Sequence, residues 1–387
     1  MSRLNRRNFF RLGGAVGAAS LAQSALPVRA EPESKKSDPP KILNQHPDMI
    51  YRRLGETDVH LSVIAMGGLV MNDAGESHHY AIDHGCNVVH ISDGYLGGKS
   101  IKVLGEVLKT KRDKVYVMLK DNFYSDEDFK SGNLDKIDEK LKVLNTDHVD
   151  FLMFNRHKAD MAANPYLREA FEKLKAKGKV RYMGLTTHGD VKGVMQAAID
   201  SGFYDILNPV LNQPSLESIA EQLKAAQAKK IAVMGMKTMK GIEGKRDLEK
   251  AYLKKVLAHP GVTCVVKGIS SREMFDDYSG AARAPLTMAE DKALYRYAME
   301  TRGRNCMMCD DCHPVCPQGI EISTVLRCID YYYGEQSDRL TATATYAELG
   351  ASQRWHATCG DCRLCEEACP HGINIVDRLD RARLTLA

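Results

Sequence analysis

The sequence lacks a long apolar run, a basic stripe and a large aromatic content. The longest weakly apolar stretch, residues 12–26, has about 15 residues, whereas a membrane-spanning helix needs about 20. The whole chain has one tryptophan, Trp355, and it has no basic residues interleaved with aromatic ones as in nucleic-acid-binding proteins. Five of the 54 basic residues are arginines within residues 1–30, which contain no acid, so the rest of the chain is close to neutral. We therefore expect neither a membrane-embedded protein nor one that binds nucleic acid.

The N-terminus has the pattern of an export signal. Arg6 and Arg7 precede the weakly apolar stretch, and small residues near Ala30 suit cleavage by a signal peptidase. This pattern resembles a twin-arginine (Tat) signal peptide, which we predict at residues 1–30. It implies recognition by the Tat export machinery, transport in the folded state and a periplasmic location. An N-terminal anchor helix is the alternative, and residues 31–48, which are polar and contain prolines, are predicted to be a linker.

Residues 49–290 alternate short apolar runs with segments whose apolar residues recur at helical spacing. Continuous apolar runs predict strands that are buried on both faces, as in a parallel sheet covered by helices. Eight such runs within about 240 residues predict a (β/α)₈ barrel, with an open doubly wound sheet as the alternative. The predicted strands are residues 63–66, 87–92, 115–120, 149–154, 180–185, 206–211, 231–236 and 262–267.

Three of these segments resemble the aldo/keto reductase family. The opening hairpin and first strand of that family are similar to "YRRLGETDVHLSVIAMGG" at 51–68. Its second strand and catalytic loop are similar to "GCNVVHISDGYLGGKSIKVLGEVL" at 85–108, and its fifth strand to "KGKVRYMGLTTHG" at 177–189. The resemblance covers residues 49–290 and implies a (β/α)₈ barrel that acts on a small carbonyl or alcohol with NAD(P)H.

The resemblance also implies a catalytic set at the carboxyl ends of the strands. Family members use a tyrosine as proton donor, a lysine that lowers its pKa, an aspartate paired with that lysine and a histidine that orients the substrate. The tyrosine and the lysine correspond to Tyr95 and Lys120. The other two positions hold His90 and Asn155, so Lys120 has lost its carboxylate partner. We expect either a weakened carbonyl reductase with Tyr95 as proton donor, or a barrel in which these residues are inherited but unused.

The sequence leaves the binding of NADP(H) open. A predicted helix start near residue 270 offers backbone amides to a phosphate, and Glu273 is placed to form a capping box with Ser270. The resemblance implies an arginine and an asparagine where this chain has Met274 and Tyr278. The candidate cofactor-binding residues are Gly268, Ser270, Ser271, Arg272 and Lys237.

Eight of the eleven cysteines form two runs with one spacing, C-x₂-C-x₂-C-x₃-C-P, at residues 306–317 and 359–370. This is the run of bacterial ferredoxins with two clusters, in which the fourth cysteine of a run ligates the other cluster. It predicts two [4Fe–4S] clusters. The expected ligands are Cys306, Cys309, Cys312 and Cys369 for the first cluster, and Cys359, Cys362, Cys365 and Cys316 for the second.

Zinc and disulfide bonds are the competing interpretations of the cysteines. Zinc sites usually present two pairs of ligands a dozen or so residues apart, and cysteines two residues apart are poorly placed to pair with each other. We therefore predict a small, mainly α-helical ferredoxin-type domain at residues 291–387, with Cys328 buried rather than a ligand. Clusters are inserted before export, which suits a route that carries folded proteins.

Together these features predict an exported iron–sulfur oxidoreductase of the aldo/keto reductase-like type. It would move electrons between two [4Fe–4S] clusters and a small carbonyl or alcohol, or a nucleotide, at the barrel mouth. A redox partner protein or a membrane electron-transfer complex would exchange electrons with the clusters. The alternative is a non-catalytic electron-transfer or partner-binding protein that uses the barrel as a scaffold.

Overall fold

The computed structural model describes residues 41–71, 73–333, 338–355 and 358–387, and Lys41–Ala387 form one compact unit. The predicted signal peptide at 1–30, and the linker up to residue 40, lie outside the described residues. In the described part of the chain no helix combines the length and the apolar character needed to cross a membrane. The predicted domain boundaries at residues 49 and 291 stay predictions.

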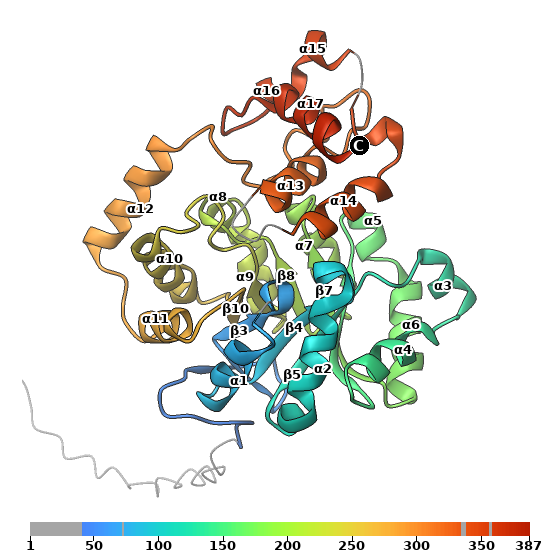
Figure 1. Cartoon of the computed structure of the whole chain (residues 1–387), viewed down its shortest axis with the longest axis vertical. Coiled ribbons are helices and arrows are strands. Elements are labelled where there is room, and N and C mark those ends of the chain that lie inside the picture. Colours follow the sequence, from blue (N-terminus) through green and yellow to red (C-terminus); the bar gives the residue numbers. More distant parts are fainter. Residues whose placement is uncertain (1–40, 72, 334–337, 356–357) are drawn as a thin grey trace, which may run out of the picture. The chain divides into compact units, whose positions relative to one another are not determined.

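Eight parallel strands close into a barrel in chain order, and the last strand pairs with the first (Figure 1). Each strand begins and ends within two residues of a predicted run, because runs of buried apolar residues determine where the strands lie. The (β/α)₈ prediction is therefore confirmed, and the open sheet is excluded. The strands are β3 (Ile64–Gly67), β4 (Val88–Ser92), β5 (Tyr116–Asp121), β6 (Val149–Asn155), β7 (Val180–Thr187), β8 (Ile206–Pro209), β9 (Ala232–Gly235) and β10 (Cys264–Lys267).

Helices follow the strands and cover the outside of the barrel (Figure 1). Their apolar residues face the strands; in α2, for example, Leu104, Val107 and Leu108 are buried whereas Lys109 is exposed. The helices of this layer are α1 (Glu76–Asp83), α2 (Lys99–Lys111), α3 (Asp126–Ser131), α4 (Lys136–Val143), α5 (Ala159–Ala162), α6 (Pro165–Ala176), α7 (Val191–Ser201), α8 (Gln213–Ser218), α9 (Ala220–Ala228), α10 (Arg246–Ala258) and α11 (Arg272–Ala282).

An antiparallel hairpin of β1 (Tyr51–Arg53) and β2 (His60–Ser62) precedes the barrel, as the resemblance implies. Its apolar residues Leu54, Val59 and Leu61 are buried in one cluster with inward-facing strand residues such as Val88 and Met118. The hairpin therefore closes the amino-terminal end of the barrel, and the opposite end is left for chemistry.

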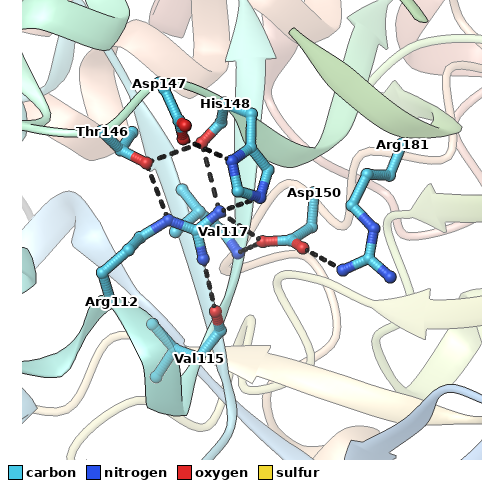
Figure 2. Close-up of polar contacts among 8 residues, drawn as sticks. All are labelled: Arg112, Val115, Val117, Thr146, Asp147, His148, Asp150 and Arg181. Carbon is cyan, nitrogen blue, oxygen red and sulfur yellow. Dashed lines mark hydrogen bonds and ion pairs between the residues drawn. The ribbon is translucent and has the colours of Figure 1, made fainter. Parts of the chain in front are cut away.

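A buried carboxylate holds the amino-terminal ends of β5, β6 and β7 together (Figure 2). Asp150 accepts hydrogen bonds from the backbone amide of Val117 at 2.9 Å, from Arg112 at 3.0 Å and from Arg181 at 2.8 Å. Arg112 also donates to the carbonyl oxygen of Val115 at 2.9 Å. All these bonds lie at the end of the barrel away from the strand carboxyl ends, where they contribute to stability rather than to a site.

The C-terminal segment is helical, as predicted, which by itself does not test the iron–sulfur assignment. Helix α13 packs on α14 and α17 through buried residues such as Val325 and Leu326. Asp338 caps α14 and also accepts a hydrogen bond from the amide of Leu96 at 3.4 Å, which joins this segment to the barrel. Its helices are α12 (Met288–Glu300), α13 (Ile322–Tyr333), α14 (Arg339–Glu348), α15 (Cys359–Cys362), α16 (Leu364–Glu367) and α17 (Ile375–Leu386).

Candidate active site and cysteine loops

A cavity of about 430 Å³ lies at the carboxyl ends of the barrel strands. The barrel lines it with His90 of β4, with Tyr95 in the short 3₁₀ helix η2 (Tyr95–Gly98) and with Lys237 after β9. Helix α13 adds Arg327 and Tyr331 to the wall. The cavity is therefore formed by the barrel and the C-terminal segment together.

Three of the four residues implied by the resemblance lie close to one another. Lys120, next to the last residue of β5, places Nζ 5.4 Å from the ring centroid of Tyr95. The ring centroids of Tyr95 and His90 are 6.4 Å apart. Leu96 and Gly97 have φ angles of 51° and 62°, and this left-handed turn directs the chain back after Tyr95. The strand ends thus gather these side chains as the sequence predicts.

Burial controls the charges of these three groups. It lowers the pKa of His90 to about 3, with a further contribution from Lys120, so this imidazole is neutral near pH 7. Burial also lowers the pKa of Lys120 to about 8, and the adjacent carboxylate, Asp121, pairs with Arg156 at 3.4 Å instead. Burial raises the pKa of Tyr95 well above the usual value for tyrosine. Tyr95 therefore releases its proton less readily than an ordinary tyrosine.

Asn155 lies at the edge of this group rather than inside it. It ends β6, and its side-chain amide donates to Asn122 Oδ1 at 2.9 Å. Asn122 in turn donates to Ser92 Oγ at 2.8 Å. Asn155 is not among the residues that line the cavity, although its own Oδ1 is buried without a partner. The structure therefore does not bring Asn155 to the cavity wall beside His90 and Tyr95.

Four buried polar atoms of cavity-lining residues have no hydrogen-bond partner in the described part of the chain. They are Nε2 of His90, Nδ1 of His188, Oγ1 of Thr238 and Nε of Arg327. Unpaired buried polar groups are costly in a folded protein, and they are retained where a ligand or water satisfies them. The cavity is therefore suited to a small polar molecule.

Sequence reasoning missed His188, Arg327 and Tyr331. His188 directly follows β7, a position at which barrel folds place functional side chains, so the predicted strand end could have indicated it. Arg327 and Tyr331 belong to a helix outside the barrel. Only its docking brings them to the cavity, and no local pattern in the sequence predicts that docking.

The candidate nucleotide-binding residues are divided by the fold. Gly268 and Lys237 line the cavity, whereas Ser270, Ser271 and Arg272 do not. Arg272 points elsewhere: its Nη2 lies 3.9 Å from a carboxylate oxygen of Glu76. These five residues therefore do not form one phosphate site around the cavity.

The predicted helix start near residue 270 is confirmed, but the predicted capping box is wrong. Ser271, not Ser270, caps α11 and accepts a hydrogen bond from the amide of Met274 at 3.2 Å. The extended backbone of Ser271 delays the helix by one residue, which moves Glu273 away from the third helical position. Tyr278 is buried and donates to Glu249 at 2.6 Å, so it belongs to the core between α10 and α11.

A second, small cavity brings the two cysteine runs together. It is lined by Cys306, Cys309 and Cys312 of the first run and by Cys369 of the second. In the other predicted set, Cys316 lies close enough to Cys365 to influence its pKa. The fold therefore brings Cys369 to three cysteines of the first run and Cys316 near Cys365, and the two ligand sets stay predictions. No disulfide bond joins any of the eleven cysteines.

Cysteine thiolates are the ligands that an iron–sulfur cluster requires. Among the described residues, no group of three His, Cys, Asp or Glu side chains is placed to hold a single metal ion. A cubane takes one thiolate for each iron, so its ligands surround a cluster rather than one ion. Burial raises the pKa of Cys306 to about 11 and of Cys309 to about 12. Burial therefore disfavours free thiolates at these positions, and a bound metal would supply the positive charge that stabilises them.

The first cysteine loop separates the two cavities and is bonded to the barrel. Asn305 and Met308 line the first cavity, whereas Cys306 and Cys309 line the second. The loop is held because Asn212 donates to the carbonyl oxygen of Met307 at 2.6 Å. The backbone amide of Asp190 also donates to Asp310 at 3.1 Å.

Comparison with known proteins shows which proteins the barrel is similar to. Residues 64–255 match the sequence model of the aldo/keto reductase family. Over these residues the barrel is similar to the aldo/keto reductase family, and this similarity supports an oxidoreductase.

Individual relatives agree with that class. The chain is 22% identical over 301 residues to the uncharacterized oxidoreductase YqkF of Bacillus subtilis (strain 168). The aligned region covers 65% of this chain and 97% of that protein. The solved structure of the aldo-keto reductase AKR11C1 from Bacillus halodurans, in its holo form, matches with a TM-score of 0.54. It is 20% identical and covers 64% of this chain and 96% of its own, so it supports the fold alone.

Proposed function

We propose that this protein is an exported iron–sulfur oxidoreductase, in which two [4Fe–4S] clusters exchange electrons with a small carbonyl or alcohol in the 430 Å³ cavity. The observation that carries the proposal is the segment 305–309, which borders both the cysteine cavity and the barrel cavity. A single loop therefore separates the candidate donor from the candidate substrate.

The cysteines would hold the clusters in the two sets predicted from their spacing. The chain supports the first set with buried surroundings for Cys306 and Cys312 and with the bonds from Asn212 and Asp190 that fix the loop on the barrel. When bound, such clusters transfer electrons one at a time. Three features support [4Fe–4S] clusters as the metal group: the cysteine donors, their spacing in the two runs and the cavity that they share.

At the substrate end, the chain offers hydrogen bonds and positive charge. The unpaired nitrogens of His90 and His188 and the hydroxyl of Thr238 could orient a polar molecule. A cation stabilises the negative charge that develops on a carbonyl oxygen during reduction, and Lys120 and Arg327 are the buried cations of this region. Helix α13 covers the barrel mouth, which limits the access of water and strengthens these interactions.

NADP(H) remains an alternative electron carrier for the same cavity. Aldo/keto reductases are typical users of this cofactor, and Gly268 and Lys237 are placed to meet it. Ser270, Ser271 and Arg272 lie outside the cavity lining, and Met274 and Tyr278 replace the residues that the resemblance implies. The support is therefore partial, and a bound nucleotide is left to experiment.

The Tat signal peptide, the periplasmic location and the redox partner are proposed from the sequence. Arg6 and Arg7 support export in the folded state, and folded export permits a cofactor that is inserted beforehand. A redox partner protein or a membrane electron-transfer complex would then exchange electrons with the clusters.

The test uses anaerobically purified full-length protein that is reduced with dithionite, freed of excess reductant and mixed with 4-nitrobenzaldehyde. We expect the alcohol to form while the reduced-cluster spectrum disappears, in wild type and in the control Cys328→Ser, whose cysteine is buried and lines neither cavity. Cys369→Ser should lose this coupling. If the alcohol forms only with added NADPH and equally fast in Cys369→Ser, the clusters are not on the electron path. If no variant forms alcohol from either donor, the barrel is a scaffold.

A further inference from the structure

The cavity contains a second, partly buried phenol close to Tyr95. Tyr331 lines the cavity from helix α13, and Lys237 Nζ lies 4.3 Å from the centroid of its ring. Lys120 and Arg327 lie close enough to influence its ionisation. The phenol thus faces groups from β5, from the loop after β9 and from its own helix.

The charges around the two phenols differ. Burial raises the pKa of Tyr331, but the positive charges of Lys237, Arg327 and Lys120 together lower it below the usual value for tyrosine. Burial raises the pKa of Tyr95, and the neighbouring Tyr331 raises it further. Two carboxylates of this wall are held elsewhere and do not offset the three cations: Asp330 pairs with Lys240 at 2.6 Å, and Glu243 accepts a hydrogen bond from the amide of Gly241 at 2.6 Å. Of the two phenols, Tyr331 therefore loses a proton more readily.

We propose that Tyr331, and not Tyr95, exchanges the proton with the substrate oxygen. The inference rests on the proposed carbonyl–alcohol reaction in this cavity and names a catalytic residue that the C-terminal segment supplies. Its structural basis is the position of the Tyr331 ring in the cavity wall against Lys237, beside Lys120 and Tyr95.

In carbonyl reduction, the proton that Tyr331 donates forms the new O–H bond of the substrate. Reduction needs two electrons and two protons. A nicotinamide donor supplies a hydride to the carbonyl carbon, whereas with an iron–sulfur donor the two clusters supply one electron each and solvent supplies the proton that forms the C–H bond. The carbonyl π bond breaks, and new C–H and O–H bonds form. The O–H bond of Tyr331 breaks as the substrate O–H bond forms, which leaves a phenolate beside Lys237, Arg327 and Lys120 until solvent returns a proton. Oxidation of an alcohol reverses each step.

Kinetics with 4-nitrobenzaldehyde test the assignment, with reduced protein or NADPH as the donor. We expect Tyr331→Phe to lower kcat on the order of 100-fold, and Tyr95→Phe to lower it less than tenfold. The matched control is Tyr332→Phe, because Tyr332 neighbours Tyr331 but packs on Tyr333 and Arg339 instead of lining the cavity. Tyr332→Phe should keep wild-type activity. A large loss in Tyr95→Phe with Tyr331→Phe within threefold of wild type overturns the inference.

A second measurement separates this inference from the proposed function. Ultraviolet difference titration at the phenolate band compares wild type with each phenylalanine variant, and it needs no substrate. We expect the phenol lost in Tyr331→Phe to titrate below about pH 10 and the one lost in Tyr95→Phe to titrate above it. If wild type reduces no carbonyl, the proposed function fails, and the titration still tests the premise that Tyr331 is the more acidic of the two phenols. A Tyr331 that titrates above Tyr95 then overturns the inference.

Discussion

Lys120 is a buried ammonium group without a carboxylate partner, because Asp121 pairs with Arg156. Burial lowers the pKa of Lys120 to about 8 in the folded protein, against about 10.4 in an unfolded chain. The unfolded chain therefore binds more protons between these two values, and the contribution of Lys120 to stability rises with pH across this window. Below about pH 8 Lys120 is charged and buried, and it lowers the free energy of unfolding.

Lys120→Met should accordingly stabilise the protein. We expect its free energy of unfolding at pH 7 to rise on the order of 2 kcal/mol over wild type, with the difference shrinking as the pH approaches 10. Urea denaturation at both pH values measures this. Lys240→Met is the control, since Lys240 is buried but bonded to Asp330 at 2.6 Å and its loss should destabilise. Equal destabilisation by both substitutions would contradict this account of Lys120.

At the residue scale, the sequence predicts those site residues that follow strand ends. His90, Tyr95 and Lys120 could be placed because a buried apolar run predicts where its strand ends. The helix cap at Ser271 was missed by one residue, because two adjacent serines offer the same local pattern and only the backbone conformation distinguishes them. Tyr331 could not be predicted, because its role depends on where α13 docks.

At the element scale, helix α14 fixes the turn that carries Tyr95. Asp338 is buried, caps α14 by accepting from the amide of Thr341 at 3.0 Å, and accepts from the amide of Leu96 at 3.4 Å. Leu340 also packs against the turn. Its Cδ1 lies 3.0 Å from the position that a Cβ atom would take at Gly97. One carboxylate thus serves both a helix end and the turn that carries Tyr95.

Asp338→Ala should therefore loosen the turn as well as the helix. We expect a loss of about 1 kcal/mol of stability from the missing cap, together with faster hydrogen exchange at the Leu96 amide. Thr287→Ala is the matched control, because Thr287 caps α12 in the same manner but has no bond to the turn. Unchanged exchange at Leu96 in Asp338→Ala would show that the bond across the two segments is not formed.

The elements themselves were largely predictable, whereas their docking was not. Strands buried on both faces and amphipathic helices leave local periodic patterns, and these placed all eight barrel strands within two residues. The contact of α14 with η2 joins residues more than 200 positions apart and leaves no such pattern. The sequence therefore predicted a barrel mouth open to a substrate, and the structure adds a wall from the C-terminal segment.

At the scale of the whole molecule, the protein joins a barrel that is similar to aldo/keto reductases to a cysteine-rich helical segment through one shared loop. The family comparison covers residues 64–255 and leaves the cysteine runs outside the matched range. The fold gathers Cys306, Cys309, Cys312 and Cys369 from two runs that are 53 residues apart, which is the arrangement that the ferredoxin spacing predicts. Whether these cysteines hold the proposed clusters therefore decides which chemistry is open to the barrel.

The most direct test is the iron and acid-labile sulfide content of anaerobically purified wild-type protein, with electron paramagnetic resonance of its reduced form. Two [4Fe–4S] clusters predict about eight irons and eight sulfides per chain and the signals of interacting reduced clusters. Folded protein that is colourless and free of iron, or that holds only zinc, would contradict the account.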